Sequence, residues 1–233
     1  MPASNGHSEA CCNTPPVVVS TDDYTPKGSY QDLGGLKTYI TSPKDVVAVA
    51  VDKGLIVIYD IFGYFPQTLQ GADILSTGGS GSGYKVFIPD WFKGNPCPIE
   101  WYPPDTKEKQ EKLGAWFGQH PPQGVAAALP AYVQAAQAAN PSIKSWAVHP
   151  AMVDPADAEH ISVPHLLIAS KDEDVDTIQR FERNLKVPHQ VVAFDDQVHG
   201  FMAARADLSD PRVREQYARG YETVLDFFSK QWK

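Results

Sequence analysis

Strand and helix signals alternate along this chain, and that alternation limits its possible folds more than any other feature. Short runs of β-branched and apolar residues, typical of buried strands, are followed by longer segments with helical spacing. The expected strands cover residues 36–41, 46–51, 55–59, 84–88, 147–153, 164–169 and 190–194, and the expected helices cover 68–75, 107–117, 125–139 and 173–185. The pattern predicts an α/β fold, with a mostly parallel sheet covered by helices on both faces.

The end of the chain predicts one more helix, which packs on the sheet. Asp210 is a suitable N-cap, and Pro211 suits the first helical position. Apolar side chains then recur at helical spacing at Val213, Tyr217, Tyr221, Val224, Leu225 and Phe228. With 233 residues, of which 42% are hydrophobic, we expect one domain over residues 29–233, preceded by an irregular arm over 1–28.

Charge and composition exclude several classes of protein. The formal net charge of −8 argues against nucleic-acid binding and against docking on anionic membranes. No apolar run is long enough to span a bilayer, and the first residues do not resemble a secretory signal. Three cysteines, two of them adjacent at Cys11 and Cys12 in the polar arm, do not make a disulfide framework. We therefore expect a cytoplasmic protein.

Polar residues that follow the strands are the candidates for chemistry, because α/β sheets bind ligands at the carboxyl ends of their strands. Asp172 follows the strand 164–169, and His199 lies between the last strand and the last helix. Taken separately, Asp172 could be a carboxylate at a helix N-terminus and His199 an ordinary loop histidine. An acid after one late strand and a histidine after the next is, however, the order found in α/β-hydrolases. We therefore favour a catalytic pair.

Motifs over nearly the whole chain, in the right order, resemble the fungal branch of the dienelactone hydrolase family. They are Tyr59-Asp60-Ile61-Phe62-Gly63, Gln70-Gly71-Ala72-Asp73-Ile74-Leu75, Pro89-Asp90-Trp91-Phe92-Lys93-Gly94, His149-Pro150, Ser170-Lys171-Asp172-Glu173, His199-Gly200-Phe201, and Cys11-Cys12 with Pro15-Pro16. The resemblance implies an α/β-hydrolase fold. It also implies hydrolysis of small ester or lactone substrates by a Cys-His-Asp triad, which needs no cofactor.

The resemblance assigns roles to individual residues. His199 would be the base and Asp172 the acid. The stretch Asp60-Ile61-Phe62 would lie beside the nucleophile, with the Ile61 N–H as half of the oxyanion hole. Asp60 stands where the family prototype has a glutamate that governs the cysteine. Separately from the resemblance, Arg205, six residues after His199, could bind an anionic substrate or be a surface arginine of a loop.

The segment that should carry the nucleophile is missing from the sequence. The family cysteine lies in a G-x-C-x-G elbow, which is a strand, a strained turn and a helix. Here the helix 125–139 is followed after a few residues by the strand that begins at Ala147 and includes His149-Pro150, which belong after the elbow. An elbow needs about 20–25 residues. We infer a deletion between Trp146 and Ala147, which leaves the fold one central strand and one helix short.

Other possible nucleophiles fit poorly. Ser80 and Ser82 belong to a Gly-Ser run that has Gly81 at its centre and precedes a strand instead of following one. Cys97 has no glycine beside it to permit the strained turn. Ser142 and Ser145 lie near the junction, but no strand carries them to the edge of the sheet.

A possible metal cluster is equally weak. His149, Asp154, Asp157 and His160 match no strong metal-site spacing, and a solvated loop with helix-capping aspartates is favoured. We therefore assign no metal.

Three functions remain open. The chain is a hydrolase of small esters or lactones, a non-catalytic relative that binds small molecules or a protein, or the product of mis-splicing or of an erroneous gene prediction for an active hydrolase. Both flanks of the junction keep the family pattern. A clean in-frame loss favours the third over the second, because gradual decay would change the cysteine and keep the strand.

Overall fold

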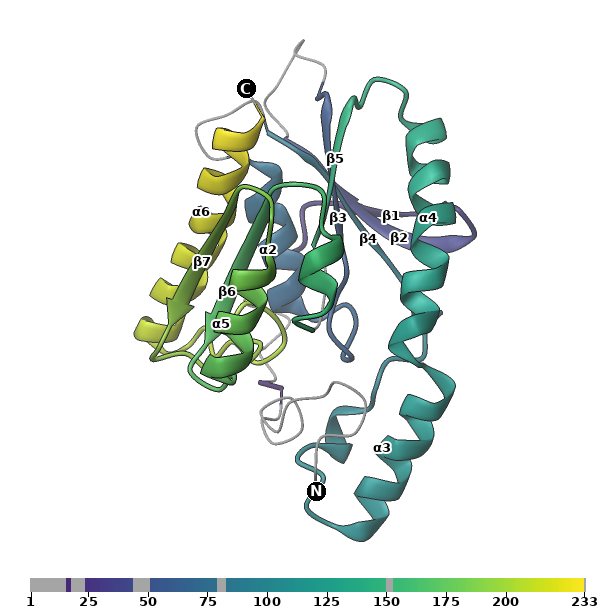
Figure 1. The fold of residues 1–233 in the computed structure, drawn as a ribbon. Helices are drawn as coiled ribbons and strands as arrows, with labels where there is room; N and C mark the ends of the chain where they lie inside the picture. The colour runs from purple at the N-terminus through teal and green to yellow at the C-terminus, as the bar shows by residue number, and fades with distance from the viewer. Residues whose placement is uncertain (1–15, 18–23, 44–50, 79–82, 150–152, 233) are drawn as a thin grey trace.

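The computed structural model describes residues 16–17, 24–43, 51–78, 83–149 and 153–232, and it confirms the α/β fold (Figure 1). The expected strand over 46–51, most of the arm 1–28 with its cysteine pair, and the serines of the Gly-Ser run lie largely or wholly outside the described residues. The strands are β1 (Ser29–Leu33), β2 (Leu36–Thr41), β3 (Lys53–Val57), β4 (Lys85–Pro89), β5 (Ser145–His149), β6 (His165–Ser170) and β7 (His189–Phe194).

The helices begin where the sequence supplies a cap or a proline. They are α2 (Pro66–Ser76), α3 (Lys107–Gln119), α4 (Pro122–Ala139), α5 (Val175–Asn184) and α6 (Pro211–Gln231), with short 3-10 turns η1 (Ile99–Trp101) and η2 (Asp157–His160). Asp210 caps α6 as expected. The expected start of α5 at residue 173 was too early, because Asp174 accepts from the Thr177 N–H and caps the helix there. No helix in the described part of the chain is long and apolar enough to cross a membrane.

The first strand was missed by the sequence analysis because it is polar and exposed. β1 pairs with β2 in an antiparallel hairpin that turns at Gly34 and Gly35. Both glycines have positive φ, 60° and 78°, as a tight two-residue hairpin turn requires. The hairpin extends the sheet at its antiparallel edge, since β2 also pairs antiparallel with β4.

Alternating side chains of the central strands build two cores on opposite faces of the sheet. Val86 and Ile88 of β4 lie in one cluster with apolar residues of α2 and α6, whereas Phe87 packs with Tyr132 and Ala136 of α4. This alternation is the period of two that a strand imposes. Figure 1 shows α2 and α6 on one side of the sheet and α4 on the other. The expected cover on both faces is confirmed.

The sheet is interrupted beside the inferred deletion. A five-stranded sheet has the order β1-β2-β4-β3-β5, and β6 and β7 form a separate parallel pair. β5 contains residues from both sides of the junction, from Ser145 to His149, and pairs in parallel with β3. No pairing joins β5 to β6 among the residues that the structure describes. The strand that should follow the elbow therefore takes a place beside β3, and the ladder breaks after it.

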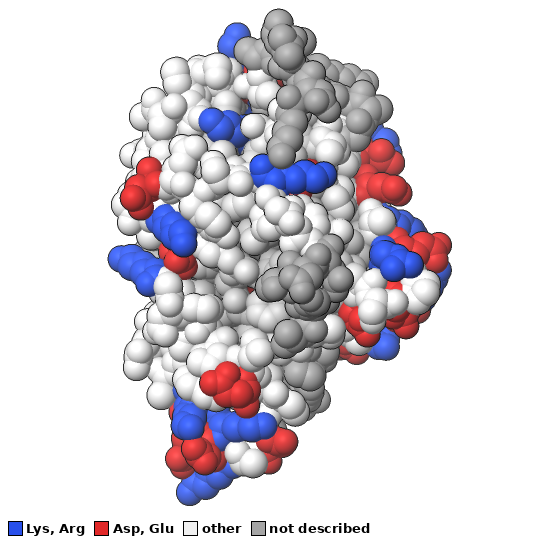
Figure 2. Space-filling model, turned by 180° about the vertical axis from the view of Figure 1, so that it is seen from behind, with Lys and Arg blue, Asp and Glu red and all other residues white. Residues whose placement is uncertain are grey.

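The charged helix α3 forms one end of the molecule. Its exposed face carries ion pairs four residues apart, Lys107 with Glu111 and Lys112 with Glu108, and Lys109 pairs with Asp105 before the helix. Figure 2 shows charges of both signs gathered at this end. The opposite face of α3 buries Leu113 and Trp116 in an apolar cluster with Phe62, Cys97 and Tyr102.

Candidate active site

Two neighbouring loops bring the predicted acid and histidine together at one edge of the β6–β7 pair. The loop after β6 and the loop after β7 are joined by a hydrogen bond from the Lys171 N–H to the Gln197 carbonyl, 3.0 Å long. Gln197 is buried. The loop after β7 then turns at Gly200, whose φ of 80° suits glycine. The structure thus places Asp172 and His199 side by side, as the strand order predicts.

The carboxylate that contacts the imidazole is nevertheless that of Glu173. His199 Nδ1 lies 2.5 Å from Glu173 Oε1, with both side chains only partly exposed. Asp172 instead binds the backbone of the histidine, since its Oδ2 accepts the His199 N–H at 2.8 Å. The structure thus shows Glu173 at Nδ1, and the role of Asp172 in orienting the ring stays a prediction. The sequence analysis read Glu173 only as a helix start, although it follows Asp172 directly.

Ser170 supports the same carboxylates from the last position of β6. Its hydroxyl lies 3.5 Å from Glu173 Oε1 and accepts the Asp172 N–H at 3.3 Å. Asp172 and Glu173 are therefore held by the end of a strand, and both act on one histidine.

Asp60 is enclosed near this pair. Its Oδ1 accepts the Phe62 N–H at 3.0 Å, and its Oδ2 is buried without a hydrogen-bond partner among the described atoms. Burial raises the pKa of the Asp60 carboxyl. The charge of Arg205 opposes that rise most strongly, followed by the N–H groups of Phe62 and Ala204. A smaller opposing effect of His199 places the histidine within electrostatic reach of Asp60.

Replacing Asp60 by asparagine is expected to stabilise the protein increasingly as the pH rises from about 4 to about 7. A carboxyl whose pKa is raised by folding contributes most below its unfolded pKa, and that contribution is lost as the pH rises through the folded pKa. The amide of the Asp60→Asn variant stays neutral, so the gain grows by about 1.4 kcal/mol for each unit of pKa difference. Urea melts at both pH values measure it, with the exposed Asp32→Asn as control. An equal effect at both pH values would contradict the assignment.

Arg205 does not lie on the open surface. It is only 3% exposed, and its guanidinium lies over the rings of Phe62 and Tyr102, 5.2 and 5.9 Å from their centroids. Its chain also packs on Gly200, where an added Cβ would lie 3.1 Å from Nη1. The guanidinium of Arg205 tolerates this burial because its delocalised charge is weakly hydrated and stacks favourably on aromatic faces. The surface reading of Arg205 is wrong, whereas its binding of an anionic substrate stays a prediction.

Ile61 and Phe62 lie between Asp60 and an apolar cluster. The Ile61 carbonyl accepts the Cys97 N–H at 2.8 Å, which ties the stretch 60–62 to the loop before η1. Phe62 is buried with Tyr102, whose ring it meets edge-on at 5.1 Å. The oxyanion role of the Ile61 N–H stays a prediction.

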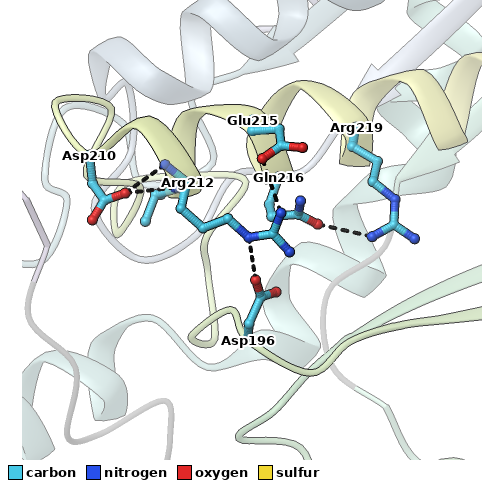
Figure 3. Close-up of polar contacts among 7 residues, drawn as sticks. Asp196, Asp210, Arg212, Glu215, Gln216 and Arg219 are labelled. Carbon is cyan, nitrogen blue, oxygen red and sulfur yellow. Dashed lines mark hydrogen bonds and ion pairs between the residues drawn. The ribbon is translucent and has the colours of Figure 1, made fainter.

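An ion pair anchors the loop that carries His199 to the last helix. Asp196 precedes the histidine by three residues, and its carboxylate lies 2.6 Å from Nε of Arg212 in the first turn of α6 (Figure 3). On the same helix Arg219 donates to Gln216 and lies over the ring of Phe194 at the end of β7. The sequence analysis did not find the contacts of Asp196 with Arg212 and of Phe194 with Arg219, because these partners are distant along the chain.

Three residues of the weak metal cluster lie in or next to η2, and the expected capping of that turn by an aspartate is wrong, because its N-cap is Ala156 and no side chain caps it. Asp154 accepts the Ala156 N–H at 2.9 Å and begins the turn that leads into η2, which contains Asp157 and His160. In the described ranges no three His, Cys, Asp or Glu side chains lie close enough to hold an ion.

Comparison with known proteins relates the whole chain to hydrolases. No family model matches the sequence. An uncharacterised AIM2 family protein of Schizosaccharomyces pombe is 32% identical, over 94% of this chain and 98% of that protein. A hydrolase of Aspergillus violaceofuscus is 23% identical over 96% of both chains, and a human carboxymethylenebutenolidase homologue is 26% identical over 89% and 93%.

Solved structures show the same fold. A dienelactone hydrolase-like promiscuous phosphotriesterase from metagenomic libraries has a TM-score of 0.56 at 16% identity, covering 88% of this chain and 98% of that one. A putative dienelactone hydrolase of Klebsiella pneumoniae has a TM-score of 0.55 at 16% identity, covering 83% and 92%.

The lengths of the sequence alignments bear on the deletion. The alignments with the fission yeast and human proteins run over 254 and 239 positions, more than the 233 residues of this chain. Both relatives therefore contain residues that have no counterpart here. The likeness to the fission yeast protein extends over almost the full length of both chains. The chain belongs to the AIM2 family and has a dienelactone hydrolase-like α/β-hydrolase fold.

Proposed function

We propose that this chain derives from a hydrolase of small esters or lactones, and that the form described here hydrolyses them poorly because it has no elbow nucleophile. The observation that carries the proposal is the contact between His199 and Glu173, 2.5 Å long, at the end of β6. Such a pair is the base and its orienting acid in triad chemistry. The sequence contains no G-x-C-x-G or G-x-S-x-G elbow, and β5, which pairs with β3, contains residues from both sides of the junction.

The geometry gives the histidine a defined task. A carboxylate at Nδ1 favours the tautomer that carries its proton there, which leaves Nε2 unprotonated and able to take a proton. In a complete triad that proton comes from the nucleophile, whose attack on the carbonyl carbon gives an acyl-enzyme and expels the alcohol. Here the same nitrogen can activate only water, which is a much weaker route.

A covalent probe tests the proposal. The chain is incubated with an activated short ester and with a thiol- and a serine-directed inactivator, and its intact mass is measured. We expect no stoichiometric adduct and slow turnover, since losing a triad nucleophile removes most of the rate. A stoichiometric adduct on Ser80, Ser82, Cys97, Ser142 or Ser145 together with rapid turnover would overturn the proposal. A chain with an inserted G-x-C-x-G elbow is the positive control.

A shortened form of an active enzyme explains the chain better than a dedicated binder. The residues on both sides of the junction form one strand that keeps a regular register with β3. Gradual loss of function would change the nucleophile and keep its strand. The transcript across the codons of Trp146 and Ala147 distinguishes the two, because an open frame that encodes G-x-C-x-G would restore the enzyme. The proposal includes a cytosolic location, supported by the few cysteines.

A further inference from the structure

A concave site separate from the His199 loops lies on the side of the molecule that carries α4. It is a cleft of about 410 Å³ between the β1–β2 turn, the loop after β4 and the first half of α4. None of its lining residues belongs to the loops that carry Glu173 and His199. The volume falls in the range of small-molecule sites, about 300–1,000 Å³.

The walls of the cleft suit a flat apolar group. Trp91, Phe92 and Tyr132 supply aromatic surface, and the Trp91 and Tyr132 rings meet edge to face at 5.4 Å, which fixes their orientation. Apart from Tyr132, the residues of α4 that line the cleft have small or medium side chains: Gly124, Val125, Ala128 and Ala131. At Gly124 an added Cβ would find its nearest neighbour 4.0 Å away.

The polar groups of the cleft suit an anion. Trp91 Nε1 is buried and has no hydrogen-bond partner among the described atoms, although a buried indole N–H normally finds one. Lys93 lines the same cleft, and none of the lining residues is acidic. Asp90 lines only an adjoining recess, and its carboxylate already accepts from Tyr59 and Gly94.

The backbone at Lys93 is unusual as well. Its φ is 53°, in the left-handed region that a lysine seldom adopts, and the described residues contain no other positive φ outside glycine. A strained backbone conformation persists only where the surrounding structure enforces it, and such conformations are frequent at ligand-binding sites. Here it belongs to the turn that carries Lys93 into the lining of the same cleft as Trp91.

We propose that this cleft binds a small planar carboxylate. The flat group packs on the aromatic wall over the small residues of α4, and the carboxylate accepts from the indole N–H of Trp91 and pairs with the Lys93 ammonium. The site is independent of the catalytic proposal, because it shares no residue with the loops around His199.

Titration calorimetry with trans-cinnamate tests the site, with the uncharged cinnamamide as the matched probe. We expect a Kd of about 0.1–1 mM for cinnamate, within the efficiency range of small ligands, and at least tenfold weaker binding of the amide. Lys93→Gln should weaken cinnamate about tenfold, and Trp91→Phe, which keeps the ring and removes the N–H, about fivefold. Gly124→Phe should fill the cleft and abolish binding.

Matched controls keep the result specific. Lys107→Gln removes a fully solvated lysine of α3, 90% exposed, and should leave the Kd unchanged. Circular dichroism checks the fold of each variant. Equal binding of acid and amide, or a Kd insensitive to Lys93→Gln but raised by His199→Gln, would overturn the proposal, because the ligand would then recognise another site.

Discussion

Inserting a strand, a G-x-C-x-G turn and a helix between Trp146 and Ala147 is expected to raise kcat/KM for activated short esters by about 10³-fold or more. The proposed base already has carboxylate partners, since His199 Nδ1 contacts Glu173 and its backbone N–H donates to Asp172. The inserted strand would take the place beside β3 that β5 now occupies, and its turn would carry the thiol to the carboxyl edge of the sheet.

Variants of the inserted protein assign the acid. If Glu173 orients the imidazole during turnover, Glu173→Gln should cost about 10²-fold or more in kcat and Asp172→Asn much less. The opposite ranking would return the role to Asp172, which the family resemblance favours. The control is the inserted protein with its elbow cysteine replaced by alanine. It folds equally well but has no thiol, so it shows how much of the rate comes from better folding alone. An inserted chain that folds, forms no acyl adduct and stays slow would refute the assignment of His199 as base.

The same insertion is expected to raise the free energy of unfolding by about 3 kcal/mol or more. Among the described residues β6 and β7 form a separate two-stranded sheet, and two strands alone are only marginally stable unless they pair further or pack on helices. Leu166 and Ile168 of β6 are only partly buried, although an apolar strand of a parallel sheet normally lies inside. Completing the burial of a large apolar side chain contributes up to about 1.5–3 kcal/mol.

Urea melts followed by near-ultraviolet circular dichroism measure the difference, and hydrogen exchange in β6 locates it. We expect a broad, early transition in the chain as it stands, with weak protection in β6, and a steep, later transition after insertion. A flexible Gly-Ser insert of equal length is the matched control and should not raise the free energy of unfolding. A sharp, reversible, high-temperature transition in the uninserted chain would contradict the expectation and favour a dedicated binding protein.

The sequence predicted the parts of this fold that depend on local pattern. Runs such as residues 164–169 have the composition of buried strands, and Asp210-Pro211 begins a helix for reasons contained in those two residues. β1 was missed because its side chains are polar and its pairing depends on the glycine turn that follows. Local pattern could not show that β5 would pair with β3 and leave β6 without a described partner on that side.

For the candidate site, too, the sequence predicted what depends on strand order and missed what depends on tertiary contacts. The positions of Asp172 and His199 follow from the strand order, so the sequence could bring them together. It could not decide which of two adjacent carboxylates reaches the ring, because that depends on how the main chain turns after Ser170. Nor could it show that Arg205 is buried on Phe62, since the two residues are far apart in sequence.

The ion pair between Arg212 and Asp196 makes the site sensitive to dissolved salt. Both side chains are well exposed, 56% and 43%, so counterions screen their attraction, whereas the partly buried contact of His199 with Glu173 is screened less. Rising ionic strength therefore weakens the ion pair that links the segment before His199 to α6, whereas the contact between His199 and Glu173 is kept. The salt concentration of the buffer is therefore expected to change how firmly residues 195–198 are held against α6.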